Sequence, residues 1–391
     1  MTDNVIILGA GASVDAGIPL LSNFVDKMWE IATRGKYNDK ELSDDDKKIF
    51  DEAMKIRNEL DGYHGRASFD DRNIEDILSI LSFNLMAGEE SDRNKLNWMI
   101  KAITRTIELT CEVKHGGQLD KIQDDGSNIY RTFWENLFTR FQNSETSFPS
   151  IISFNYDLVM ERALFQILIG KTYNNEFESR NFPFDGINLK YQYRYLNNIS
   201  YSVKYVWYDN SEKVDHERIY GRSGITLEKC GTGDLQHPID IEILKLHGSL
   251  NFPSTDQIGK SDIAPTIPAE EPHIIPPIIN KSISAEQTMW SAGLKRLREA
   301  KNIIIVGYSL PQTDIYMQYF IKAGIGPNTN LNRIFVFNPA LQKGSEENER
   351  MRERFGNCFS PQLRNRIVFN EGTFYDFVES IGYSDNGLFF T

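Results

Sequence analysis

The chain has 391 residues, of which 40% are hydrophobic and 25% charged, proportions that are ordinary for a globular protein with a sizeable core. Its net charge of −12 argues against strong intrinsic nucleic-acid binding, because phosphates are contacted mainly by Lys and Arg. The three cysteines are far apart and form no CxxC pair, so neither a disulfide framework nor a four-cysteine zinc site is indicated. No apolar stretch is long enough to span a membrane and the first residues lack a signal-peptide pattern, so we expect a cytoplasmic protein.

A short apolar run at residues 5–8 predicts a buried parallel strand. It ends in the turn Gly-Ala-Gly-Ala-Ser at 9–13, and we expect an amphipathic helix to follow over about 13–33. Such a turn lets the backbone approach a diphosphate closely, while the helix offers free N–H groups to its negative charge. The alternative is a tight turn with no ligand, because Val14 replaces the third glycine of the usual dinucleotide motif and no P-loop lysine is present.

Two stretches of different character interrupt the predicted core. Residues 36–147 are rich in charge and show helical spacing, so we interpret them as an α-helical insertion. Residues 171–240 carry alternating or tyrosine-rich strings, which predict a β-rich insertion made of hairpins. The tyrosines either pack this insertion or an oligomer contact, or stack on bases. Packing is favoured, because few cationic residues interleave with them.

The remaining segments, 1–35, 148–170 and 241–391, alternate short apolar strands with helices and therefore predict one doubly wound, Rossmann-like parallel sheet of the α/β class. A proline-rich loop over 253–280 interrupts the last segment. After the first strand, further strands are expected at 151–155, 241–246, 303–306, 334–337 and 367–369. Ligands of such sheets bind beyond the carboxyl ends of the strands, where several polar residues of this chain are predicted to converge.

Three of these residues have side chains suited to chemistry. Asn155 offers an amide for a ribose hydroxyl or a water. Asp157 offers a carboxylate that accepts from a carboxamide, although it also suits a cap for the helix that begins there. His247 is a natural general base near neutral pH, although a lone histidine is more often structural.

Five blocks of the chain, in order, resemble the signature of sirtuins. They are Gly-Ala-Gly-Ala-Ser with Gly17-Ile18-Pro19, Phe154-Asn155-Tyr156-Asp157, His247-Gly248, Gly307-Tyr308-Ser309-Leu310 and Phe337-Asn338-Pro339. The longer sequences around these blocks, including Val306-Gly-Tyr-Ser-Leu-Pro-Gln-Thr-Asp314, are similar to those of bacterial sirtuin-like (Sir2-domain) proteins of antiphage defence. The resemblance covers about half the chain, in separated blocks.

The resemblance implies an NAD hydrolase that releases nicotinamide and ADP-ribose and depletes cellular NAD on infection. It assigns the diphosphate to the turn at 9–13, the adenosine end to Ser309 and Asn338, and the carboxamide to Asp157. Asn155 then holds the nicotinamide ribose or a water, and His247 activates a ribose hydroxyl or the attacking water. The expected cofactor-binding residues are Gly9, Ala10, Gly11, Ser13, Pro19, Asn155, Asp157, Gly307, Ser309 and Asn338. The expected catalytic residues are Asn155, Asp157 and His247, and no metal is expected.

Some members of that group pair with a HerA-like ATPase and DNA translocase, and others with a short argonaute. The length of this chain and the lack of a recognisable extra domain resemble the HerA-associated kind. We therefore expect a HerA-like partner, with a short argonaute as the alternative, and a homo-oligomer whose assembly matches the symmetry of the ATPase ring.

Two departures from sirtuins and two further alternatives bear on this expectation. Deacetylating sirtuins hold zinc with two CxxC pairs and continue Gly-Ile-Pro with Asp-Phe-Arg, where this chain has Leu20-Leu21-Ser22. Both departures weaken a deacylase or ADP-ribosyl transferase assignment. A non-hydrolytic sensor of NAD or ADP-ribose stays open, because binding and hydrolysis share most residues. A dehydrogenase is disfavoured, because the GxGxxG motif is incomplete and no acidic residue ends a second strand about 20 positions later.

Overall fold

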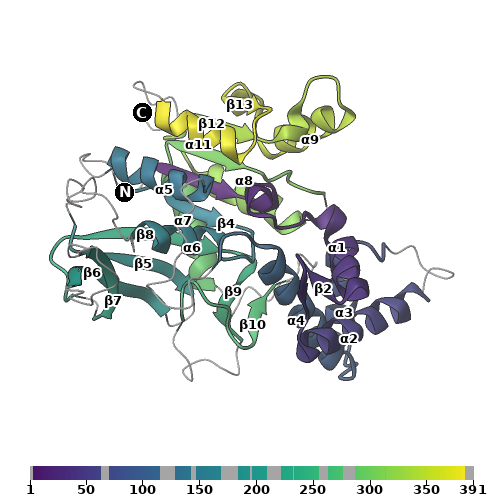
Figure 1. Ribbon diagram of the computed structural model, residues 1–391. Helices are drawn as coiled ribbons and strands as arrows, with labels where there is room; N and C mark the ends of the chain where they lie inside the picture. The colour runs from purple at the N-terminus through teal and green to yellow at the C-terminus, as the bar shows by residue number, and fades with distance from the viewer. Residues whose placement is uncertain are drawn as a thin grey trace.

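The computed structural model describes residues 3–62, 70–114, 128–141, 147–168, 184–193, 196–208, 222–231, 233–254, 263–275, 287–312 and 314–383. Nine strands form one central sheet in the order β13-β12-β11-β1-β4-β8-β5-β6-β7 (Figure 1). Their bounds are β1 Asn4–Leu8, β4 Ser150–Ser153, β5 Gly186–Tyr193, β6 Leu196–Tyr208, β7 Arg222–Cys230, β8 Pro238–Lys245, β11 Asn302–Val306, β12 Arg333–Phe337 and β13 Ile367–Asn370.

The six strands β1, β4, β8, β11, β12 and β13 carry the doubly wound topology. Numbered in chain order they lie as 3-2-1-4-5-6, all parallel, with the reversal of order between β1 and β11. Every residue of β1 is buried, because the strand has a partner on each side and helices cover both faces of the sheet. The predicted Rossmann-like α/β fold is thus confirmed.

Two sets of helices cover the sheet. One set is α5 (Ile129–Phe141), α6 (Val159–Leu168) and α11 (Phe374–Tyr383), in which α5 packs against both of the others. The other set is α7 (Gln287–Glu299), α8 (Ile315–Ile325) and α9 (Glu346–Cys358), packed in that order, with the short α10 (Pro361–Arg364) after it. From β1 the chain moves along the sheet to β4 and β8, and later from β11 to β12 and β13 in the opposite direction. Because both sets of crossover connections are right-handed, their helices lie on opposite faces of the sheet.

A separate helical cluster lies beside the sheet, at the lower right of Figure 1. It consists of α1 (Leu21–Arg34), α2 (Asp44–Asp61), α3 (Ile74–Met86) and α4 (Asp92–Thr110), which pack on one another. A small hairpin of β2 (Lys36–Tyr37) and β3 (Lys40–Glu41) joins α1 to α2. The predicted helical insertion at 36–147 therefore supplies α2 to α4, whereas its last helix, α5, covers the sheet.

The predicted hairpins in 171–240 continue the central sheet. Strand β5 pairs in parallel with β8, and β6 and β7 follow it in antiparallel register. Tyr191 and Tyr193 of β5 are buried against Phe252, with ring centroids 5.4 and 4.1 Å from the phenyl ring. These two tyrosines pack the protein, as favoured above, whereas Tyr195 and Tyr220 lie outside the described residues.

The helix predicted over 13–33 is wrong at its start. A 3-10 helix, η1 (Ala10–Ala16), follows β1, and α1 begins only at Leu21. Gly17 ends η1 with φ of 81°, and a Cβ there would lie 2.5 Å from the carbonyl oxygen of Thr110. The close passage of α4 thus requires glycine and a break at this position. The predicted apolar face survives, since Phe24, Met28 and Ile31 are all buried.

The proline-rich loop predicted over 253–280 contains regular structure in part. Strands β9 (Gly248–Pro253) and β10 (Pro272–Ile274) form a two-stranded antiparallel sheet after β8. Residues 255–262 and 276–280 of the predicted loop lie outside the described residues. Among the helices that the structure describes, none is both long and apolar enough to cross a membrane.

Candidate active site

A cavity of about 480 Å³ lies where the carboxyl ends of the parallel strands face the helical cluster. Residues that follow all six strands of the doubly wound sheet border it. The predicted site residues that line it are Ala10, Gly11, Ser13, Pro19, Asn155, Asp157, His247, Gly307, Ser309 and Asn338. Gly9 is the one predicted site residue that does not line the cavity, but its carbonyl accepts a hydrogen bond from Asn155.

The glycines at the ends of β1 and β11 are required by contact between the two turns. A Cβ on Gly9 would lie 2.6 Å from the Cβ of Tyr308, and one on Gly11 would lie 2.8 Å from the Cα of Gly307. Gly307 itself has φ of 65°, a region that favours glycine. The Gly11 N–H donates to the Gly307 carbonyl at 2.9 Å, so this donor serves the fold and not a diphosphate.

Asn155 is held by the first turn and leaves one acceptor unused. Its Nδ2 donates to the Gly9 carbonyl at 2.9 Å and to Ser13 Oγ at 2.8 Å. Its Oδ1 is buried and has no hydrogen-bond partner among the residues that the structure describes. A buried amide oxygen without a partner costs about 1–3 kcal/mol, which a ligand hydroxyl or a water can offset by donating to it. The amide is therefore preorganised to accept a hydrogen bond.

Asp157 combines the two roles that its position suggested. Its Oδ1 accepts from the Val159 N–H at 3.1 Å and so caps α6. Its backbone carbonyl accepts from the buried ammonium of Lys245. The carboxylate still borders the cavity, so capping fixes the position of a group that can also meet a ligand.

His247 has a carboxylate partner that the sequence interpretation did not assign. Its Nε2 lies 3.5 Å from Oδ2 of Asp314, and Tyr308 donates its hydroxyl to the same oxygen at 3.0 Å. Burial, and then the charge of Asp314, raise the pKa of Tyr308 well above its usual value, so the phenol stays a donor. A carboxylate beside an imidazole orients the ring, as general-base catalysis requires. The only sequence signal for Asp314 was its place at the end of the Gly-Tyr-Ser motif.

Four of these residues, Asn155, Asp157, His247 and Asp314, form what we call the sheet-edge wall of the cavity. The opposite, helical wall is formed by Ile74 and Leu78 of α3 and by Ile103 and Ile107 of α4. The sequence predicted these helices but not their place in the site, because nothing in their spacing points to a particular partner surface.

The cavity is acidic. Its carboxylates come from Asp15, Glu75, Asp157, Asp314 and Glu347, and none of the described residues that line it is Lys or Arg. Fixed negative charge beside a bound ligand stabilises a positive charge that develops on that ligand. The lining therefore suits a reaction with a cationic transition state.

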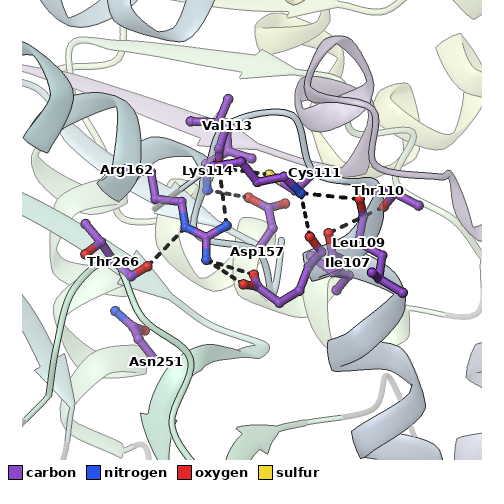
Figure 2. Close-up of polar contacts among 12 residues, drawn as sticks. Ile107, Leu109, Thr110, Cys111, Val113, Lys114, Asp157, Arg162, Asn251 and Thr266 are labelled. Atoms are coloured by element: carbon purple, nitrogen blue, oxygen red, sulfur yellow. Dashed lines mark hydrogen bonds and ion pairs between the residues drawn. The ribbon is translucent and has the colours of Figure 1, made fainter. Parts of the chain in front are cut away.

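Arg162 of α6 links that helix to the end of α4 and to the loop at Thr266, as Figure 2 shows. From α6 it donates to both carboxylate oxygens of Glu108 on α4, each at 2.8 Å. It also donates to the backbone carbonyls of Val113 and Thr266, at 3.2 and 3.0 Å. The Arg162 side chain is 2% exposed and that of Glu108 is 20% exposed, and the charge-assisted bonds between them are of the strong kind. The network holds the helical wall in a fixed position over the cavity.

The described residues contain no cluster of His, Cys, Asp and Glu side chains that could hold a metal ion. Cysteine chemistry is disfavoured at the site. Cys111 and Cys358 are buried, and burial raises the pKa of the Cys111 thiol to about 11. A thiol of that pKa is a poor nucleophile at neutral pH.

No protein-family model matches the chain, and no curated protein matches it either.

Proposed function

We propose that this chain is an NAD⁺ glycohydrolase that cleaves NAD⁺ to nicotinamide and ADP-ribose. The observation that carries the proposal is the unpartnered Oδ1 of Asn155, which borders the same cavity as the His247–Asp314 pair. An unused acceptor and an oriented imidazole are what a water or a ribose hydroxyl needs in order to be held and activated. The sirtuin-like order of the motifs adds NAD⁺ as the substrate.

The doubly wound sheet suggests how the dinucleotide lies. The diphosphate of NAD⁺ crosses the sheet edge between β1 and β11, where the strand order reverses, near the turns that contain Gly11 and Gly307. The bond that breaks lies toward β4 and β8, because Asn155 and His247 follow those strands. The adenosine then lies over β11 and β12.

The chemistry follows from the placement of the side chains. Asn155 accepts from the nicotinamide ribose or from a water near its anomeric carbon, and Asp157 accepts from the carboxamide. The C–N bond breaks, its electron pair leaves with nicotinamide, and the acidic lining stabilises the oxocarbenium-like state. Water adds to the anomeric carbon, and His247 takes the proton directly or through a ribose hydroxyl. The balance is NAD⁺ and water to nicotinamide, ADP-ribose and a proton.

The cellular role that we propose rests on the motif resemblance alone. The hydrolase is the effector of an antiphage defence system in the cytoplasm, and a HerA-like ATPase, or else a short argonaute, controls it. An unregulated NAD hydrolase would kill its host, so we expect a homo-oligomer whose activity depends on this partner.

The direct test is to incubate the purified protein with NAD⁺, alone and with the HerA-like partner, and to follow nicotinamide and ADP-ribose by chromatography. We expect turnover, and a loss on the order of 10²-fold or more in His247→Ala, as for a positioned general base. The exposed His237 offers a matched control, His237→Ala, which should keep full turnover. Undiminished cleavage by His247→Ala would refute the mechanism.

The same assay separates the alternative functions. Tight NAD⁺ binding without turnover in either condition would favour a sensor. Turnover only with an acyl-lysine or protein acceptor would favour a deacylase or ADP-ribosyl transferase.

A further inference from the structure

An ion pair lies at the end of the cavity opposite His247. Glu347, on the first turn of α9, lines the cavity together with Ser309 and Asn338. Arg354 donates from Nη2 to Glu347 Oε1 at 2.5 Å and from Nε to the Ser309 carbonyl at 3.2 Å. The Arg354 side chain is 14% exposed, whereas that of Glu347 is 44% exposed. Glu347 therefore presents a carboxylate to the cavity, and the guanidinium of Arg354 already donates to Glu347 and to the Ser309 carbonyl.

The position of this carboxylate relative to the ligand follows from the proposed function, on which the inference rests. With the reacting ribose near His247 and the diphosphate between β1 and β11, the second ribose lies beyond the end of β12. Asn338 directly follows that strand, and its Oδ1 caps the short η5 (Pro339–Leu341) by accepting from the Ala340 N–H. Glu347 is the charged lining residue at this end.

We infer that Glu347 makes the site selective for NAD⁺ over NADP⁺. A carboxylate can accept hydrogen bonds from the 2′ and 3′ hydroxyls of a ribose, but it repels the dianionic 2′-phosphate of NADP⁺. The positive end of α9 does not compensate, because its first turn already carries Glu346, Glu347 and Glu349. Arg354, which would otherwise suit a phosphate, is held by Glu347 and the Ser309 carbonyl.

The test compares kcat/KM for NAD⁺ and NADP⁺ in the wild type, Glu347→Gln and Glu346→Gln. We expect the wild type to prefer NAD⁺, and Glu347→Gln to reduce that preference about tenfold, mainly through better use of NADP⁺. Glu346→Gln is the matched control, because Glu346 is 86% exposed and pairs with Arg350. Adding Arg354→Gln to Glu347→Gln should remove the gain for NADP⁺.

Calorimetry with ADP-ribose and with 2′-phospho-ADP-ribose gives a readout that does not need turnover. The inference is supported if the wild type binds ADP-ribose more tightly than 2′-phospho-ADP-ribose and if Glu347→Gln makes the two affinities more nearly equal. This result supports it even if no hydrolysis is found and the hydrolase proposal fails. A preference that Glu347→Gln leaves unchanged overturns the inference while NAD⁺ hydrolysis stands. Binding of neither probe in the wild type overturns the inference, while the turnover assay decides the hydrolase proposal separately.

Discussion

The sheet-edge wall and the helical wall face each other across one cavity, but they differ in chemistry and in how they are held. The sheet-edge wall is made of polar side chains placed just beyond strand ends or at a helix start, each fixed by bonds to neighbouring turns. The helical wall consists of isoleucine and leucine side chains, with Glu75 of α3 as the carboxylate beside them, and belongs to a cluster that packs mainly on itself.

The two walls of the cavity therefore have different tasks. The sheet places the groups that act on a ligand, because hydrogen bonds to neighbouring turns fix the side chains at the strand ends. The helical cluster adds apolar side chains to the cavity, and an apolar surrounding strengthens the electrostatic effect of those groups. Arg162 and Glu108 connect the two parts, so the walls can be tested separately and together.

The largest effect, on the free energy of unfolding, is expected from breaking the Arg162–Glu108 ion pair. Arg162→Ala leaves Glu108 without its partner, and removal of one member of a buried pair costs about 3–5 kcal/mol of the free energy of unfolding. Urea unfolding measures the loss. The control is Arg350→Ala, whose pair with Glu346 is exposed and should cost about 0–1 kcal/mol. Equal losses in the two variants would show that Arg162 does not join the walls.

The next effect concerns the sheet-edge wall. Asp314→Asn keeps the size of the side chain but removes the charge that orients His247, so we expect kcat for NAD⁺ cleavage to fall about 10²-fold with little change in KM. Steady-state kinetics separates the two parameters. A raised KM with unchanged kcat would mean that Asp314 binds the substrate and does not position the imidazole.

A smaller effect is expected in the helical wall. Ile103→Val removes one methylene from the cavity lining and should cost about 1 kcal/mol of stability. KM should rise a few-fold while kcat stays constant, because an apolar contact stabilises bound substrate and transition state alike. Ile321→Val, buried in α8 away from the cavity, is the control with a similar stability cost and no kinetic change. A fall in kcat would contradict the division of tasks between the walls.

The smallest effect is expected at the start of α11, where Thr373 and Phe374 border the cavity. The Thr373 N–H and hydroxyl donate to Asp376 at 2.6 and 2.8 Å and lower the pKa of that carboxyl below its ordinary 3.8. The stabilisation is present above pH 3.8 and is lost as the pH falls through the lowered pKa.

Asp376→Asn should therefore cost about 0.5 kcal/mol at pH 7, a value discounted for the exposure of the side chain. The difference from the wild type should shrink as unfolding is measured at pH values below 3.8. A difference that stays constant down to pH 3 would exclude this linkage.

Several features could be predicted from sequence because they are local. The strands appeared as continuous apolar runs, since parallel strands are buried on both faces. Asn155 and His247 could then be placed together, because carboxyl ends of parallel strands meet at one edge. The predicted helix over 13–33 failed because its break at Gly17 depends on the carbonyl of Thr110, which lies 93 positions later in the chain.

The sequence by itself determined where the strands of the parallel sheet lie along the chain, and that Asn155, His247, Ser309 and Asn338 follow them and meet at one edge. Only the tertiary structure decided that Asp314 partners His247, that α3 and α4 supply the apolar wall, and that β5 to β7 extend the central sheet. It also revealed that Gly9 and Gly11 are needed by the neighbouring turn at Gly307. Periodicity and turn residues report on neighbours along the chain. Each of these contacts joins segments far apart in sequence, which come together only when the core packs.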